Sequence, residues 1–312
     1  MQIVRHIDDP SLSLTASVVT LGNFDGIHVG HQALIAGAVA DARDFSIPSV
    51  VLTFEPHPLR VLAPERAPKM LLSHKDKMQL LQALGVDIVV IQNFDLSFAK
   101  VAAADFVRSI LAGRLRARKI WVGADLRFGA GRKGGVAELR DWGHDLGFSV
   151  ETVAAVLLNG ARVSSSRIRQ LVIEGQVDMV EPMLGRYHFL SGRVVRGHRR
   201  GRDLGFPTAN ISTRTEVLPL DGIYATLFHH GDRFWPSVSS IGVNPTFGAG
   251  PRSIESHILK FRDDIYGAAV KLSFVRRLRS EMKFPSADAL TAQIRQDVEQ
   301  ANSVFRAMKL AG

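Results

Sequence analysis

The sequence contains no cysteine. This absence excludes disulfides, thiolate metal sites, zinc fingers and cysteine nucleophiles. Long apolar runs are also missing, since none approaches the roughly 18 residues that a membrane-spanning helix needs, and the first residues show no apolar signal core. Trp and Tyr are scarce, with three of each, so an aromatic platform for nucleic-acid bases is not expected. We therefore expect a cytoplasmic protein that enters no membrane and binds no nucleic acid.

Basic residues outnumber acidic ones. The 312 residues include 39 Lys and Arg against 30 Asp and Glu, which gives a net charge of +9. Such a surface is either simply solvated or complementary to a phosphate-rich partner. Many of the arginines stand beside glycines, whose backbone allows an anion to come close, and this arrangement favours phosphate-binding loops.

The first half of the chain alternates short, almost continuously apolar runs with helical patterns. This alternation predicts an α/β domain with a parallel sheet, in which ligands bind beyond the carboxyl ends of the strands. The expected strands are residues 17–21, 49–54, 88–91, 120–122 and 148–152. The expected helices are residues 31–43 and 104–111, a helix that follows the 164–166 hydroxyls, and residues 176–184.

Beyond residue 186 the pattern changes to short strands broken by Gly, Pro and Asn. This pattern predicts an all-β domain, an antiparallel barrel or sandwich, and Ser286 is expected to open a final helix. The expected strands are residues 192–196, 223–228, 237–242, 253–260 and 269–276. A chain of this length suits two domains, and we place them at 1–182 and 183–312.

The strongest local motif is GNFDGIHVGH at residues 22–31, between the first main strand and the first helix. Glycines let the backbone approach a phosphate, and the amides at a helix N-terminus favour anions. Imidazole N–H groups can stabilise the charge that develops when a nucleotidyl group is transferred. The alternatives are two histidines that only cap a helix, or a metal pair. The candidate residues are Gly22, Asn23, Phe24, Asp25 and the catalytic His28 and His31.

Three further segments of the first half could serve the same site. Three hydroxyls between arginines at a helix start could hold the β- and γ-phosphates of ATP, or could form an ordinary N-cap. An Asp after a strand could position the nucleotide, or could sit in a turn. Two side chains of the proline-containing loop at residues 53–58 could face a ring, or could belong to a structural loop. These candidates are Arg162, Ser164, Ser165, Ser166 and Arg169; Asp125; and Phe54 and His57.

A second phosphate site is predicted in the later half. Its Arg/Gly-rich loop contributes Gly197, Arg200 and Arg202. Thr208 and Asn210 stand two residues apart, so both can face one way on an extended segment and offer oxygen ligands to Mg²⁺. The alternative is an Asx-type turn after proline.

Glu255 is the candidate base of this second site. Period-two alternation sends Ile254 and Ile258 to one face and Glu255 to the other. A carboxylate there could take the proton from an alcohol that attacks a γ-phosphate. Taken alone, Glu255 could equally be a solvated strand residue.

With these segments in this order, the chain resembles the bacterial bifunctional riboflavin kinase/FMN adenylyltransferase family. The resemblance extends over nearly the whole chain and includes the segments DGIY, GVNPTF and RSEMKF of the second half. One departure is Ser166, where the family often has Thr, and the hydroxyl is kept.

The resemblance implies a Rossmann-like nucleotidyltransferase domain followed by a β-barrel kinase domain, with ATP as substrate, Mg²⁺ as cofactor and riboflavin and FMN as further substrates. It implies that His28 and His31 stabilise the transferring phosphate and that Glu255 is the kinase base. It also implies flavin contacts at Phe54, His57, Phe128 and Phe284.

Two other functions remain open from the residues alone. One is a different nucleotidyltransferase, such as a pantetheine-phosphate or cytidylyl enzyme, with an unrelated second domain. The other is a basic RNA-binding module, which would bind nucleic acid tightly in a salt-sensitive manner without turnover. The oligomeric state does not follow from the sequence.

Overall fold

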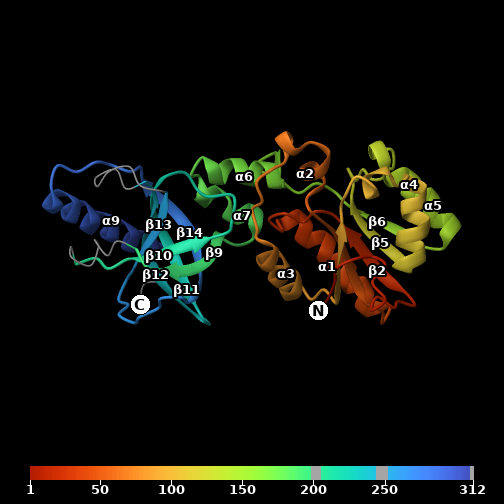
Figure 1. Ribbon diagram of the computed structural model, residues 1–312, viewed down its shortest axis with the longest axis horizontal. Coiled ribbons are helices and arrows are strands. Elements are labelled where there is room, and N and C mark those ends of the chain that lie inside the picture. The colour runs from red at the N-terminus through yellow and green to blue at the C-terminus, as the bar shows by residue number, and fades with distance from the viewer. Residues whose placement is uncertain (198–204, 244–251, 310–312) are drawn as a thin grey trace. The chain divides into compact units, whose positions relative to one another are not determined.

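The computed structural model describes residues 1–197, 205–243 and 252–309. Contacts between residues divide the chain into two compact units (Figure 1). The first unit comprises residues 1–69 and 74–164, and the second comprises residues 70–73 and 165–312.

A six-stranded parallel sheet forms the centre of the first unit (Figure 1). Its strand order is β1-β4-β3-β2-β5-β6. The strands are β1 (Gln2–Val4), β2 (Ser17–Leu21), β3 (Ser49–Glu55), β4 (Ile88–Asn93), β5 (Ala117–Gly123) and β6 (Ser149–Val153). The five strands expected from the apolar runs are confirmed. The three-residue β1 was not expected, because so short a run carries no distinctive pattern.

Helices cover both faces of this sheet, which explains why its strands read as continuous apolar runs. On one face, α1 (Val29–Asp44) packs Ala38 and Ala42 against Val18 of β2. On the other face, the π-helix η3 (Phe106–Arg114) and α5 (Val136–Leu146) pack against alternate residues of the same strands. The remaining helices are α2 (Pro58–Leu62), η1 (Pro64–Arg66), α3 (His74–Ala83), η2 (Phe98–Lys100), α4 (Ala103–Asp105) and η4 (Ala130–Arg132).

The strand order reverses beside β2, which pairs with β3 on one side and with β5 on the other. In open α/β sheets this switch point is where ligands bind, because the loops that leave the two strands diverge. The loop that follows β2 contains the predicted histidine motif, and the loop that follows β5 contains Asp125. A short hairpin, β7 (Leu157–Leu158) and β8 (Ala161–Arg162), ends the unit.

A closed antiparallel barrel forms the centre of the second unit, in the order β10-β13-β12-β11-β14-β9 (Figure 1). The strands are β9 (His188–Val195), β10 (Ala209–Thr213), β11 (Gly222–His230), β12 (Arg233–Gly242), β13 (Ser253–Ile258) and β14 (Ala269–Arg279). The expected barrel and five of its strands are confirmed, and β10 is an additional strand. Three short helices precede the barrel: α6 (Ser165–Ile173), η5 (Val177–Met179) and α7 (Glu181–Leu184).

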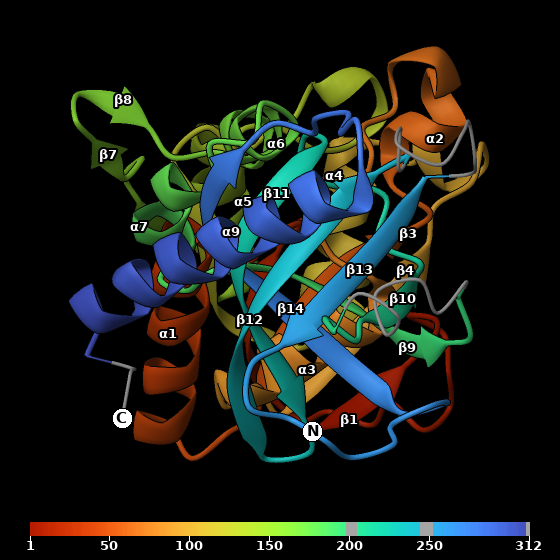
Figure 2. The ribbon, with the colours of Figure 1, turned by 90° about the vertical axis from the view of Figure 1, so that its left-hand side faces the viewer.

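The final helix, α9 (Ala287–Ala307), lies across the outside of the barrel against β11, β12 and β14 (Figure 2). The Ser286 hydroxyl accepts a hydrogen bond from the Ala289 amide at 3.2 Å and so caps the helix as expected. Ala301 and Phe305 are fully buried against the barrel wall. Asp297, also buried, pairs with the Arg279 guanidinium through two hydrogen bonds of 2.8 and 2.7 Å.

We predict that Asp297→Ala lowers the free energy of unfolding of the second unit by about 3 kcal/mol, because it removes the partner of the Arg279 guanidinium, whose side chain is only 17% exposed. Urea unfolding measures the effect. Glu299→Ala removes an exposed carboxylate from the same helix and is expected to change stability by less than about 0.5 kcal/mol. Equal effects of the two substitutions would contradict the prediction.

Candidate active sites

The loop between β2 and α1 is held in an unusual conformation. Phe24 has a φ of 49° and Ile27 a φ of 40°, in the left-handed region that such side chains rarely adopt. Both side chains are fully buried, so packing holds the backbone in this conformation. Strain that is held by packing is common at functional sites, where it fixes a geometry before the ligand arrives.

This loop delivers two stacked histidines to the start of α1. His28 is the N-cap, and its Nδ1 accepts a hydrogen bond from the His31 amide at 3.3 Å. The two rings are stacked, with centroids 3.6 Å apart and planes 16° apart. Gly30 makes room for this arrangement, because a Cβ there would lie 3.2 Å from the His28 ring. The capping alternative is therefore realised in part: the cap occupies Nδ1 of His28 and leaves Nε2 as the ring nitrogen that can donate a proton to an anion.

His31 is held in its neutral form. Burial, followed by the charges of His28 and Lys77, holds the pKa of His31 well below its usual range. Within the described part of the chain, the Nδ1 atom of His31 and the Oδ1 atom of Asn23 are buried without a hydrogen-bond partner. Buried polar atoms without a hydrogen-bond partner are rare in folded proteins. Two such atoms in one loop are expected where a bound substrate supplies the missing hydrogen bonds.

Asp125 and Arg162 come together on the other side of the switch point. Asp125 follows β5 and Arg162 ends β8, and their side chains form an ion pair with Nη2 2.6 Å from Oδ2. Both side chains remain about half exposed to solvent. The pair places a carboxylate and a guanidinium, groups that can bind ribose hydroxyls and phosphate, beyond the carboxyl end of β5.

Phe54 and Phe128 belong to one row of aromatic rings beyond strands β3, β4 and β5. Phe54 contacts Phe94 and Phe98, and the centroid of each of these rings lies 5.9 Å from that of Phe54. Phe128 is buried and contacts Phe106 at 5.6 Å. Two of the predicted flavin contacts, Phe54 and Phe128, therefore share one apolar cluster, and their contact with a flavin stays a prediction.

His57 caps α2 and also contacts the histidine loop. Its Nδ1 accepts from the Leu59 amide at 3.2 Å, and its Nε2 lies 3.2 Å from Nδ2 of Asn23. Gly22 lies under the Phe24 ring, where a Cβ would be 3.3 Å from it. Asp25 is buried in the same loop.

The predicted triphosphate seat is divided between the two units. Arg162 and Ser164 belong to the first unit, whereas Ser165, Ser166 and Arg169 lie in α6 of the second. The helix does begin at these hydroxyls, as expected. Their binding of ATP stays a prediction, as does the domain boundary at 182/183.

A second group of polar side chains lies on the outside of the barrel. β10 and β13 are paired so that Asn210 is opposite Glu255. Ile254 and Ile258 point into the barrel core, and Glu255 points out, as the alternation predicts. The Thr208 hydroxyl donates to Oε2 of Glu255 at 3.1 Å. The structure therefore brings together three oxygen-bearing side chains that are up to 47 residues apart in the sequence.

Gly197 completes this cluster by its lack of a side chain. A Cβ at residue 197 would lie 2.3–2.6 Å from the amide atoms of Asn210, a separation that real atoms do not tolerate. The backbone at the end of β9 therefore touches the Asn210 side chain directly. Arg200 and Arg202, predicted for the same loop, lie outside the described residues.

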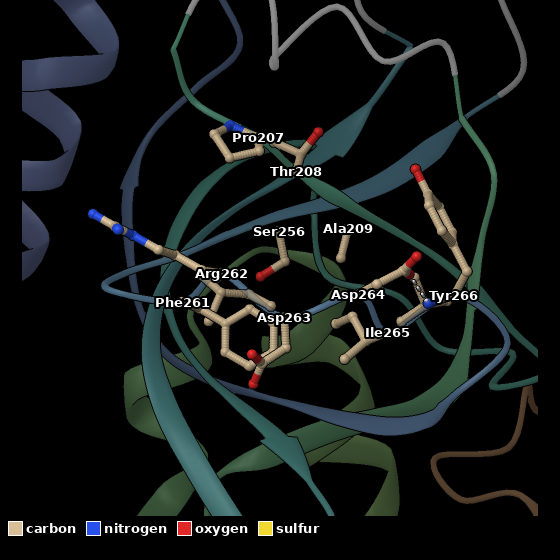
Figure 3. A pocket seen from close by; sticks show the side chains of 12 residues that line it. Pro207, Thr208, Ala209, Ser256, Phe261, Arg262, Asp263, Asp264, Ile265 and Tyr266 are labelled. Atoms are coloured by element: carbon tan, nitrogen blue, oxygen red, sulfur yellow. Dashed lines mark hydrogen bonds between the residues drawn. The ribbon is translucent and has the colours of Figure 1, made fainter.

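A cavity of about 510 Å³ opens beside Thr208 (Figure 3). Its lining combines apolar side chains such as Phe261 and Ile265 with charged ones such as Arg262 and Asp264. Thr208 contributes to the cavity and also bonds to Glu255, so the cavity ends at the polar cluster. A pocket of this size and composition is typical of a small-molecule site.

Phe284 lies after β14, beside the Arg279 guanidinium, whose carbon is 5.8 Å from the ring centroid. Since Arg279 is fixed by Asp297 of α9, the position of Phe284 depends on the final helix. Its contact with a flavin stays a prediction.

Sequence reasoning missed Lys77 of α3. Its Nζ donates to the Asn23 carbonyl at 3.1 Å and to the Thr53 hydroxyl at 3.4 Å. Asn23 is 54 residues away in the sequence, and a single lysine within a helix carries no local signal that could have revealed the contact.

Comparison with known proteins agrees with this division into two sites. The family model described as FAD synthetase matches residues 11–167, and the one described as riboflavin kinase matches residues 184–305.

No helix among the described residues is long and apolar enough to cross a membrane.

Full-length relatives match as well. The bifunctional riboflavin kinase/FMN adenylyltransferase of Escherichia coli K12 is 36% identical over 313 residues, which cover 100% of both chains. That of Haemophilus influenzae is 34% identical and covers 98% of this chain and 99% of its own.

A solved structure covers 95% of this chain and 97% of its own, with 32% identity and a TM-score of 0.85. It is described as a macrolide-efflux protein from Streptococcus pneumoniae, a description that disagrees with the flavin-enzyme names above.

The family models and curated relatives agree with one another over both halves. The chain belongs to the bifunctional riboflavin kinase/FMN adenylyltransferase family, which phosphorylates riboflavin to FMN and adenylylates FMN to FAD.

Proposed function

We propose that the two reactions occur at the two sites described above, FMN adenylylation at the histidine loop and riboflavin phosphorylation at the Thr208–Asn210–Glu255 cluster. The observation that carries this proposal is that the chain has two separate groups of polar side chains, a stacked histidine pair and a cluster of oxygen-bearing side chains, each within its own unit. Since both reactions consume ATP, we also propose that the enzyme works in the cytoplasm.

In the adenylyltransferase site, a phosphate oxygen of FMN attacks the α-phosphorus of ATP, a new P–O–P bond forms, and pyrophosphate leaves. The transition state carries additional negative charge on the α-phosphate oxygens. The Nε2–H of His28 and the amides at the N-terminus of α1 are the donors that can stabilise that charge. His31, stacked on His28, limits the positions that the His28 ring can take.

In the kinase site, Glu255 accepts the proton of the riboflavin 5′-hydroxyl as its oxygen attacks the γ-phosphorus, and ADP leaves. A positioned base of this kind contributes about 10²- to 10⁴-fold to the rate. The Thr208 hydroxyl, 3.1 Å from the carboxylate, fixes the orientation of Glu255. We assign the adjoining cavity to the nucleotide, because Thr208 joins the cavity to the base.

The same cluster fits a Mg²⁺ ion. Thr208 and Asn210 are neutral oxygen donors that sit side by side, and Mg²⁺ commonly binds through few protein ligands together with substrate phosphates. Thr208 and Asn210 would hold the ion, which would neutralise phosphate charge during transfer.

We predict that the two activities can be removed separately. Glu255→Ala or Asn210→Ala should abolish formation of FMN from riboflavin but leave conversion of FMN to FAD, because only the kinase cluster changes. His28→Ala should do the reverse. Chromatographic separation of the flavins after incubation with ATP and Mg²⁺ measures both. A single substitution that abolishes both reactions in a folded protein would show that the sites are not independent.

Gly197→Ala should lower the rate of riboflavin phosphorylation by about 10²-fold, because its Cβ would displace Asn210. FAD formation from FMN is the internal control and should not change. The prediction fails if Gly197→Ala phosphorylates riboflavin at the wild-type rate.

Chelation tests the proposed ion. Excess EDTA should stop FMN formation, and MgCl₂ should restore it. Thr208→Val should raise the Mg²⁺ concentration needed for half-maximal rate. FMN formation that continues in EDTA would contradict the assignment.

A further inference from the structure

Lys77 points inward from a helix that also has an exposed lysine. In α3, Lys75 is exposed to solvent, whereas Lys77 reaches the Asn23 carbonyl at 3.1 Å and the Thr53 hydroxyl at 3.4 Å. Burial lowers the pKa of Lys77 and outweighs the opposing effect of the Asp25 and Glu55 carboxylates. Desolvating an ammonium group is unfavourable, so the contacts that Lys77 makes must stabilise its inward position.

The contacts of Lys77 join the two loops that border the adenylyltransferase site. Asn23 belongs to the histidine loop, and Thr53 lies near the end of β3, just before the Phe54–His57 segment. Asn23 is fixed from a second direction as well, by its amide contact to His57 at 3.2 Å. The residue after Asn23, Phe24, has the left-handed φ of 49°. Lys77 therefore holds the backbone directly before the strained part of the loop.

We propose that Lys77 is a positioning residue of the adenylyltransferase site, which holds the histidine loop against the end of β3 and sets the charge environment of its two imidazoles. The proposal rests on the function proposed above for that loop. Lys77 acts through Asn23 and the histidines, and no contact of Lys77 with substrate is invoked.

The charged groups around His31 give this proposal a distinctive signature. His28 faces His31 from its own helix start, and Lys77 faces it from α3. Lys77 in turn faces Asp25 of the loop and Glu55 of β3, and Glu55 is paired with His74 at 2.8 Å. Since the charge of Lys77 contributes to the lowered pKa of His31, removal of that charge should raise the pKa of His31. A residue that served only for packing would not produce this shift.

The test compares Lys77→Met, which keeps most of the stem and removes the charge, with Lys77→Arg, which keeps the charge. In Lys77→Met we expect kcat for conversion of FMN to FAD to fall by about 10²-fold, with FMN formation unchanged. The pKa of His31, followed by NMR titration of the ring and assigned with His31→Gln, should rise. In Lys77→Arg the pKa of His31 should stay low and part of the FAD-forming activity should return. Lys75→Met, on the exposed side of α3, should match the wild type in both measurements.

Wild-type FAD formation by Lys77→Met would overturn the proposal. So would a loss of activity without a change in the pKa of His31, because the role would then be packing alone. If Lys77→Met does not fold, Thr53→Val removes one of the two contacts with little change of shape, and wild-type activity of that variant would overturn the proposal instead.

His28→Ala separates this proposal from the function on which it rests. If His28→Ala still forms FAD, the assignment of the histidine loop is wrong. If His28→Ala is inactive and Lys77→Met is fully active, the assignment stands and the role of Lys77 is wrong.

Discussion

The hydrogen bond from the His31 amide to the His28 ring is the interaction on which the geometry of the proposed adenylyltransferase site depends. It ends the strained loop, begins α1 and determines which nitrogen of His28 carries the proton. The rest of the first unit supports that geometry. Buried Phe24 and Ile27 hold the loop in its left-handed conformation, and Gly30 leaves room for the ring. Parallel strands that are covered on both faces place the loop at the switch point of the sheet.

The kinase cluster uses a different solution. Its side chains lie on the outside of a closed barrel, where cross-strand pairing between β10 and β13 sets Asn210 opposite Glu255. Strand register is rigid because a shift by one residue would turn Glu255 into the core and Ile254 out of it. The barrel therefore fixes the base without a strained loop. Each unit thus fixes the geometry of its proposed site through local backbone constraints.

Much of this organisation could be predicted from the sequence, and the failures have physical causes. The central strands were predictable because burial on both faces leaves unbroken apolar runs. The position of the histidine loop at the start of α1 and the outward direction of Glu255 were predictable from local motif and alternation, whereas the roles of His28, Thr208, Asn210 and Glu255 stay predictions. The direct contact of Gly197 with Asn210 was not, and neither was Lys77, because both depend on residues brought together only by the tertiary fold.

The central claim is that one chain contains two phosphate-transfer sites that work independently. Mixing the His28→Ala and Glu255→Ala variants with riboflavin, ATP and Mg²⁺ tests it most directly. Neither variant alone should convert riboflavin to FAD, whereas the mixture should, because FMN released by the first variant reaches the intact adenylyltransferase site of the second. A mixture of two folded variants that forms no FAD would contradict the account.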